Sequence, residues 1–185
     1  MGRVTAVVCA AFDPAGDAAI YVVRERVRLA GISLPDRPPH RPHFSLAAAR
    51  VERGDELDRL VEVAAGVATR HSPIPLTLNE VGRFGRSGVL WLGPDRCPAL
   101  ADLQRDSVES IAATGWPAAF GERTEPAQWI AHCTLATRVP KPELREVQQA
   151  VRVGYEPVAA TVDALAVILV GGSGDIAHFA LEWRH

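Results

Sequence analysis

Two short stretches of the sequence each carry a histidine two positions before a hydroxyl side chain. Residues 43–47 read His-Phe-Ser-Leu-Ala, and residues 132–136, roughly half a chain later, read His-Cys-Thr-Leu-Ala. Because histidine titrates near neutral pH, one imidazole can take a proton from an attacking water while the other protonates the departing oxygen of a phosphodiester. The hydroxyl groups of Ser45 and Thr134 can donate hydrogen bonds to the non-bridging phosphate oxygens, where charge develops. The candidate catalytic residues are therefore His43, His132, Ser45 and Thr134.

An extended strand would place the two polar side chains of each motif on the same face, because residues i and i+2 point the same way. The intervening Phe44 and Cys133 would then face the opposite, apolar side together with the leucine of each motif. If the two halves of the chain pack about a pseudo-twofold axis, two histidines and two hydroxyl groups line one groove.

The elements expected around the motifs occur in the same order in both halves. Each half has a helix, the motif strand, a second helix and then a hairpin. Apolar periodicity predicts helices over 15–29, 55–67, 98–114 and 142–151, and strands over 4–12, 43–49, 74–81, 89–92, 129–137, 158–170 and 176–183. Glycine-containing turns are expected at 82–88 and 171–175, and a long loop at 115–127.

Short hairpins mixed with crossing helices favour an α+β fold over a doubly wound parallel sheet. We expect a single bilobal domain over 1–185, with pseudo-symmetric lobes of about 1–93 and 94–185 that can exchange strands. Mainly antiparallel sheets would surround the central groove, with helices on the outside.

Composition sets limits on the function. The chain has 185 residues, of which 48% are hydrophobic and 23% charged, and these values exclude disorder, collagen-like sequence and coiled coil. The formal net charge of −2 argues against a broad grip on duplex nucleic acid. Lys141 is the single lysine, so basic contacts to an anion would fall to arginine.

Cysteine usage and hydropathy indicate a cytoplasmic protein that does not enter a membrane. Cys9, Cys97 and Cys133 cannot all pair within the chain, and no two stand at zinc-finger spacing, so we expect reduced thiols. No apolar run approaches the twenty or so residues that cross a bilayer. Residues 4–12 could pass for a signal-peptide core, but Asp13 and Pro14 end them as they would end a buried strand.

Simpler interpretations of the motifs remain open. A single His-x-Ser in a strand is often a chance occurrence, and the matched pair could be an inherited duplication without retained activity. A two-histidine metal site would lack a third ligand, because Cys133 is expected on the other face. Acyl transfer is disfavoured, because neither hydroxyl has an Asp-oriented histidine and no Gly-x-Ser-x-Gly elbow occurs.

The paired motifs resemble the two-histidine (2H) phosphoesterase superfamily, and most closely its 2'-5' RNA ligase-like branch, which includes RNA 2',3'-cyclic phosphodiesterases. The resemblance also covers the opening strand, the Arg-Pro-His entry to the first motif and the hairpin from Phe84 to Gly93. It implies a bilobal fold whose motifs face each other across a groove. It also implies that 2',3'-cyclic phosphates or 2'-5' linkages are opened, or 2'-5' linkages formed, without a metal or nucleotide cofactor. Ser45 stands where threonine is commoner, and Thr137 where many members have a basic residue.

Four further residues are candidates for substrate binding. In an extended strand, Arg41 would lie on the same face as His43, and Arg138 on the same face as His132. Each could instead be a solvated surface arginine. Phe84 is expected in the hairpin turn beside Arg86, where it could stack on a base, whereas the neighbouring Trp91 is expected in the core. Three side chains of the long loop could form a flap over the groove or pack on the lobe: Trp116, Phe120 and Arg123.

Three hypotheses follow. The leading one is a metal-independent phosphodiesterase acting on a small nucleotide or RNA terminus that bears a cyclic phosphate or a 2'-5' bond, with no cofactor, no duplex nucleic acid partner and a monomeric state. The second is a non-catalytic binder of nucleotides or RNA ends that retains the duplicated groove. The third, ranked last, is a two-histidine metalloprotein.

Overall fold

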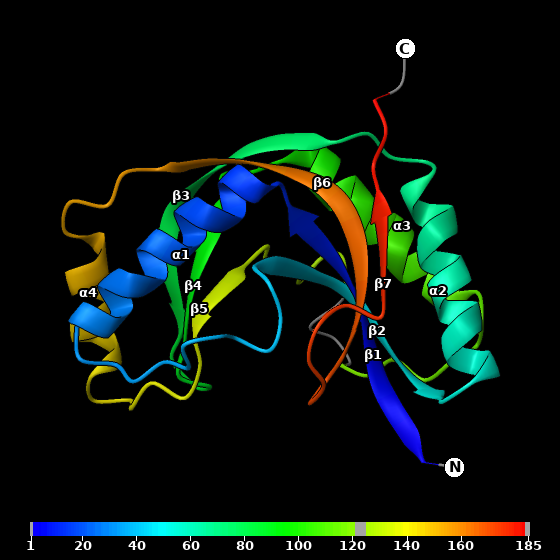
Figure 1. Ribbon diagram of the computed structural model, residues 1–185, viewed down its shortest axis with the longest axis horizontal. Coiled ribbons are helices and arrows are strands. Elements are labelled where there is room, and N and C mark those ends of the chain that lie inside the picture. Colours follow the sequence, from blue (N-terminus) through cyan, green and yellow to red (C-terminus); the bar gives the residue numbers. More distant parts are fainter. Residues whose placement is uncertain (1, 121–124, 184–185) are drawn as a thin grey trace.

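A seven-stranded antiparallel sheet forms the centre of the computed structural model, which describes residues 2–120 and 125–183 (Figure 1). Its strands follow the order β1-β2-β5-β4-β3-β6-β7, and β6 also pairs with β1. The strand bounds are β1 Arg3–Phe12, β2 His43–Glu52, β3 Ile74–Phe84, β4 Val89–Pro94, β5 Cys133–Ala136, β6 Val158–Leu169 and β7 Ala177–Ala180. The expected α+β class with mainly antiparallel pairing is confirmed.

Strand β6 belongs to two parts of this sheet. Residues from Val158 to Val162 pair with β3, and residues from Val162 to Leu169 pair with β1, so Val162 has a partner in each strand. Figure 1 shows β6 arching across the molecule from β3 towards β1 and β7. Strand β6 therefore joins a group formed by β3, β4 and β5 to a group formed by β1, β2 and β7, and the two groups also meet where β2 pairs with β5.

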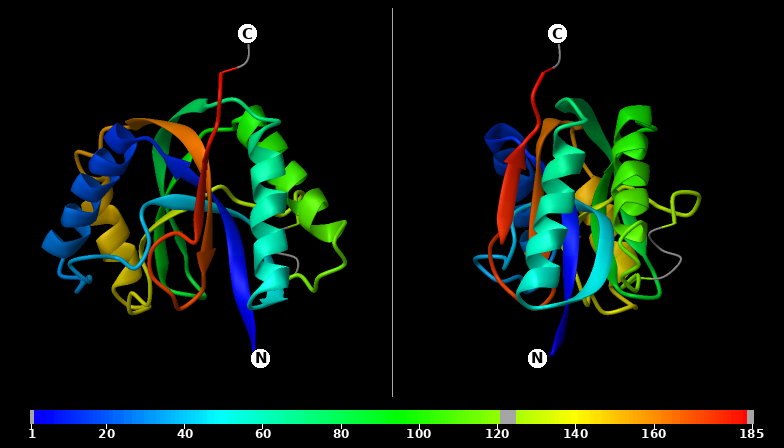
Figure 2. Two further views of the ribbon diagram at one scale, coloured as in Figure 1. Left: turned by 45° about the vertical axis from the view of Figure 1, so that its right-hand side comes forward. Right: turned by 90° about the vertical axis from the view of Figure 1, so that its right-hand side faces the viewer.

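Four helices described here cover the outer sides of the two strand groups (Figure 2). Helices α1 (Pro14–Leu29) and α4 (Leu144–Arg152) contact each other; α1 packs on β5 and β6, and α4 on β3. Helices α2 (Asp55–Ala68) and α3 (Pro98–Ala112) contact each other and pack on β2. Each group therefore combines a helix from the first half of the sequence with a helix from the second.

Local sequence accounts for the start of the first two helices. Asp13 caps α1, where its carboxylate accepts from the backbone N–H of Gly16 at 3.1 Å, and Pro14 occupies the first turn. The same carboxylate accepts from the backbone N–H of Thr161 at 3.1 Å, which ties α1 to β6. Helix α2 follows Gly54, whose φ of 91° favours glycine, and its first turn is acidic, as the helix dipole prefers.

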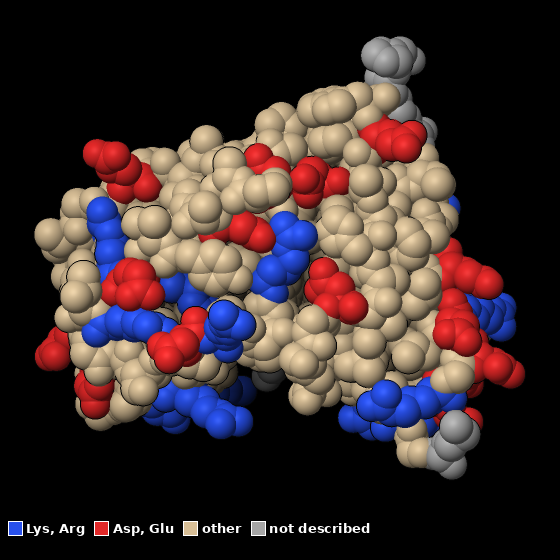
Figure 3. Space-filling model, viewed as in Figure 1, with Lys and Arg blue, Asp and Glu red and all other residues tan. Residues whose placement is uncertain are grey.

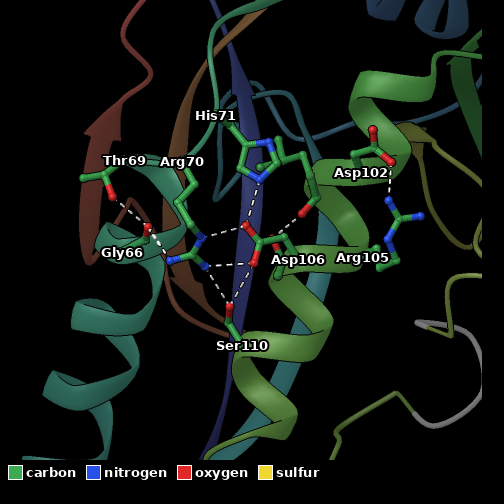
Figure 4. A network of polar contacts seen from close by, with 10 residues as sticks. Gly66, Thr69, Arg70, His71, Asp102, Arg105, Asp106 and Ser110 are labelled. Carbon is green, nitrogen blue, oxygen red and sulfur yellow. Dashed lines mark hydrogen bonds and ion pairs between the residues drawn. The ribbon is translucent and has the colours of Figure 1, made fainter. Parts of the chain in front are cut away.

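Helices α2 and α3 are joined by ion pairs around Asp106 (Figure 4). Arg70 approaches the Asp106 carboxylate with two nitrogens at 2.8 and 3.0 Å, His71 Nε2 lies 2.8 Å away, and the Ser110 hydroxyl lies 3.2 Å away. Hydrogen bonds from Arg70, assisted by His71, lower the pKa of Asp106 to about 2. The carboxylate therefore stays ionised and holds the two helices together.

Several elements differ in extent from the sequence prediction, and β2 continues to Glu52. Strand β5 spans only Cys133–Ala136, and the chain leaves it at Arg138, where φ is 58°. Strand β3 continues through Phe84, so the turn is confined to 85–88, where Gly88 passes close to the carbonyl of Val139. Strand β7 ends at Ala180. Within the described ranges no helix is both long and apolar enough to cross a membrane.

Candidate active site

The imidazoles of the two motifs are held in the same way. His43 Nδ1 lies 2.8 Å from the carbonyl oxygen of Arg41, and His132 Nδ1 lies 2.8 Å from that of Ile130. A carbonyl can only accept, so Nδ1 donates and the neutral ring has its lone pair on Nε2. Each motif therefore presents the same tautomer, with Nε2 available for proton transfer.

Burial along the motifs alternates as two strand faces require. His43 and Ser45 are half-buried, as are His132 and Thr134, whereas Phe44 and Cys133 are buried. The thiol of Cys9, which is paired with Ser45 across β1 and β2, contacts the Ser45 side chain. Both motifs therefore direct their apolar side chains into the core and keep their histidine and hydroxyl accessible.

Burial lowers the pKa of both histidines below the ordinary value of 6.5. For His43, the carbonyl of Arg41 partly opposes this shift, and the positive charges of His40 and His132 lower the pKa further. For His132, the carbonyl of Ile130 likewise opposes it. The fold thus brings the two imidazoles within electrostatic range of each other.

A cavity of about 430 Å³ adjoins His132. Phe84, Arg86 and Gln128 contribute to its lining. The Phe84 ring meets the imidazole edge-on, with ring centroids 4.9 Å apart and an interplanar angle of 84°. The structure therefore brings Phe84 and Arg86 together with His132, although Phe84 lies at the end of strand β3 rather than in the turn.

Trp91 supports this cavity from the core. Its side chain is 6% exposed, and its ring centroid lies 5.4 Å from that of Phe84 and 6.4 Å from that of His132. The indole lies directly against the backbone of Gly82 and Gly93: a Cβ at Gly82 would overlap the ring, and one at Gly93 would come within 2.7 Å of it. The expected core position of Trp91 is confirmed, and two glycines make room for it.

Arg41 has other partners than the expected anion. Its guanidinium donates to Asp17 Oδ2, at 2.8 Å from Nη2 and 3.0 Å from Nε, to the carbonyl of Phe12 and to His178 Nε2 at 3.2 Å. Arg41 borders a cavity beside His43, but its donors tie α1 and β1 to β7. Arg138 is exposed in the turn after β5 and lines neither cavity described beside the histidines.

The long loop after α3 packs on the molecule in the part that is described. Ala118 pairs with Ala49 of β2, and the Arg59 guanidinium lies over the Trp116 ring at 5.9 Å from its centroid. Phe120 is 39% exposed, and Arg123 lies outside the described residues. Trp116 therefore follows the packing alternative rather than the flap.

A family model described as the 2'-5' RNA ligase superfamily matches residues 13–174. The chain belongs to this superfamily. Membership confirms the two-histidine phosphoesterase resemblance and supports an enzyme that acts on phosphodiester bonds. The matched range includes both motifs, with their equivalently hydrogen-bonded histidines, and the hairpin from Phe84 to Gly93.

Solved structures share the fold of this superfamily member over its whole length. Escherichia coli LigT complexed with 3'-AMP is 17% identical, with a TM-score of 0.64, over 98% of this chain and 99% of that one. The protein TT0787 of Thermus thermophilus is 19% identical, with a TM-score of 0.62, over 98% and 100%. A protein described as a phosphoesterase is 17% identical, with a TM-score of 0.62, over 98% and 99%. A search of curated proteins found no match.

Several site features were not found from the sequence. Arg24 of α1 and His40 line the cavity beside His43, and Gln128 lines the one beside His132. Arg24 lies on an amphipathic helix far from either motif, so helical periodicity alone gave no signal for it. Across 2–120 and 125–183, no three His, Cys, Asp or Glu side chains are arranged to hold a metal ion.

Proposed function

We propose that this protein is a metal-independent phosphodiesterase that opens 2',3'-cyclic phosphates on nucleotides or RNA ends. The observation that carries the proposal is the matched pair of Nδ1–carbonyl hydrogen bonds of His43 and His132. These bonds leave the Nε2 atom of each histidine available for proton transfer. Membership in the 2'-5' RNA ligase superfamily supports the same reaction class.

In the proposed step, the oxygen of a water molecule attacks phosphorus while the Nε2 of one neutral histidine takes its proton. The bond between phosphorus and one ribose oxygen breaks, and the protonated Nε2 of the other histidine gives that oxygen a proton. One proton is taken and one is given, so the product is a phosphomonoester beside a free ribose hydroxyl. Ser45 and Thr134 donate hydrogen bonds to the non-bridging oxygens as their charge develops.

The cavity beside His132 suits the base of such a substrate. Its volume of about 430 Å³ is ample for a nucleobase, and Phe84 offers an aromatic face for stacking. Structures of Escherichia coli LigT complexed with 3'-AMP, ATP and NADP+ show that a protein of this fold accommodates nucleotides.

The charge distribution on the face seen in Figure 3 favours a short ligand. Acidic and basic side chains are interspersed on the face seen in Figure 3, without a continuous basic track. Binding along a long phosphate backbone depends on many cationic contacts in a row. We therefore propose that the substrate is a small nucleotide or a single RNA terminus.

The test is an assay of the full chain with a panel of nucleoside 2',3'-cyclic phosphates and 2'-5'-linked dinucleotides in the presence of EDTA. We expect release of a phosphomonoester from the cyclic substrates, and loss of that activity in His43→Ala and in His132→Ala. His71→Gln, which removes a histidine from the α2–α3 contact, is the matched control and should retain turnover. Full activity in either motif variant would end the assignment, and tight binding without turnover would favour the non-catalytic alternative.

A further inference from the structure

The two motif strands separate on one side of the active site. Strands β2 and β5 pair at Phe44 and Cys133, and towards the start of β2 and the end of β5 a cavity of about 240 Å³ lies between them. His43 and Thr134 contribute to its lining, as does the proline-rich segment from Leu34 to Pro42 that precedes β2. We call this cavity the β2–β5 slot.

Arg24 reaches the slot from helix α1, which packs on β5. The side chain is half-buried, and it has no hydrogen bond or ion pair with the residues that the structure describes. Its neighbours are all engaged: Arg26 donates to the carbonyl of Gly154 at 2.7 Å, Arg28 pairs with Asp36 at 3.1 Å, and Arg41 pairs with Asp17. A partly desolvated guanidinium without a partner favours binding of an anion.

The remaining lining of the slot is also suited to an anion. His40 Nδ1 is buried without a hydrogen-bond partner in the described structure, and the His40 ring lies 6.3 Å from that of His43. Ser33 and Thr137 contribute hydroxyl groups, and the lining residues include no carboxylate. Burial also lowers the pKa of Arg24, as expected for a charge that has lost water without gaining a partner.

We propose that the β2–β5 slot is a second phosphate subsite, in which Arg24 binds a phosphomonoester that the substrate carries in addition to the reacting phosphodiester. This inference rests on the proposed function and names its substrate class: nucleotides or RNA fragments with a 5'-phosphate one ribose away from the cyclic phosphate. The base and the 5'-phosphate leave the ribose ring at opposite ends. The cavity at His132 and the slot at His43 would receive them on the two sides of the reacting phosphorus.

The experiment compares uridine 2',3'-cyclic phosphate with its 5'-phosphorylated form. The ratio of the two kcat/KM values is measured for the wild type, Arg24→Met and Arg24→Lys. We expect the wild type to prefer the 5'-phosphorylated substrate and Arg24→Met to lower that preference about 10- to 100-fold, the range for a charge-assisted hydrogen bond. Arg24→Lys should recover part of the preference, and in Arg24→Met the loss should fall mainly on the 5'-phosphorylated substrate, because only that substrate carries the phosphate that Arg24 binds.

Arg37→Met is the matched control, because Arg37 is exposed on the same proline-rich segment but does not line the slot. It should leave the preference unchanged. An unchanged preference in Arg24→Met would overturn the inference, and so would an equal loss on both substrates, which would place Arg24 at the reacting phosphate.

If the wild type hydrolyses neither substrate, the proposed function fails on its own, and calorimetric binding then tests the subsite. Uridine 3',5'-bisphosphate should bind the wild type more tightly than uridine 3'-monophosphate, and this difference should disappear in Arg24→Met. Equal affinities for the two nucleotides in the wild type would overturn the subsite. Unchanged far-UV circular dichroism and melting temperature show that each variant is folded.

Discussion

The imidazole of His132 meets the edge of the Phe84 ring, with centroids 4.9 Å apart and ring planes at 84°. The contact joins two parts of the chain, the end of strand β3 and the residue before strand β5. Together with the carbonyl of Ile130, Phe84 restricts the orientation of the His132 ring. The same phenyl ring lines the cavity offered to a base, so substrate binding and the position of an acid–base group depend on one side chain.

Phe84→Ala should therefore raise KM for a nucleoside cyclic phosphate by about tenfold, within the range measured for base–aromatic stacking. It should also lower kcat, because the His132 ring loses its edge-on contact. Phe84→Tyr, which keeps the aromatic face, should stay close to wild type. Phe120→Ala removes another partly exposed phenylalanine that lines neither cavity and serves as the control in the same steady-state assay. Wild-type kinetics for Phe84→Ala would show that the base does not bind in this cavity.

The pH dependence of kcat/KM should follow from the lowered pKa of both histidines. The reaction needs one protonated and one neutral imidazole, so the profile should be bell-shaped, with apparent pKa values that belong to the pair. As pH rises through the higher value, the acid loses its proton and activity falls. Because burial lowers the pKa of each histidine below 6.5, the alkaline limb should also have its midpoint below pH 6.5. Activity that still rises above pH 7, measured at constant ionic strength, would contradict this assignment.

The two hydroxyl groups should act mainly on kcat. Ser45→Ala and Thr134→Val each remove a donor to the developing oxyanion, and loss of one such donor typically lowers kcat by about 10²- to 10³-fold. Ser45→Thr and Thr134→Ser retain the hydroxyl and should retain most of the activity. Single-turnover measurements separate this effect from weaker binding. If the alanine and valine variants raised KM and left kcat unchanged, the hydroxyls would be binding groups and not part of the acceleration.

Asp106→Asn should destabilise the fold by about 1 kcal/mol, the upper range for exposed ion pairs, because Arg70 and His71 lose their partner. Asp106 has a folded pKa of about 2, below its ordinary value of 3.8. Its contribution is therefore complete above pH 3.8 and lost as pH falls through 2. Urea titrations should show the difference from wild type shrinking in that interval. Asp102→Asn, whose carboxylate pairs with the exposed Arg105 on the same helix, should change little and provides the comparison.

Gly82→Ala should destabilise the protein by about 1–3 kcal/mol, since the new methyl group would overlap the Trp91 ring and force the core to shift. Displacement of Trp91 should also disturb Phe84 and His132, so kcat/KM should fall together with stability. Gly85→Ala lies three positions further on in the turn, where the added Cβ meets only the flexible end of Arg83 at 3.4 Å. Chemical denaturation gives the free energy of unfolding of both variants. Equal values would show that Trp91 can move without destabilising the protein.

The sequence determined much of the local structure and of the motif faces. The expected alternation at residues 43–46 and 132–135 appears as alternating half-buried and buried side chains, because period-two sequence and strand geometry express the same constraint. Amphipathic periodicity likewise located all four described helices, and β-branched composition located β6. The roles given to His43, His132, Ser45 and Thr134 remain predictions for the assays above.

The remaining features depend on contacts between segments far apart in the chain. The alternation of a strand placed Arg41 on the face of His43. It could not show that Asp17 and His178 would bind its guanidinium. Arg24 belongs to a helix whose polar positions look alike in sequence, and only the separation of β2 from β5 makes it part of a cavity. The assignment of helices to strand groups also follows from tertiary packing and not from local pattern.

Strand β6 couples the unfolding of the two parts of the sheet. It pairs at one end with β3 and at the other with β1 and β7, so both parts of the sheet lose edge pairing when this strand is withdrawn. Strand β3 lies before residue 93 and β6 after it, and a fragment ending there would leave apolar edges of β1 and β3 without their partner. Unfolding should therefore proceed as one cooperative transition, and neither half of the chain should persist as an independent folding unit.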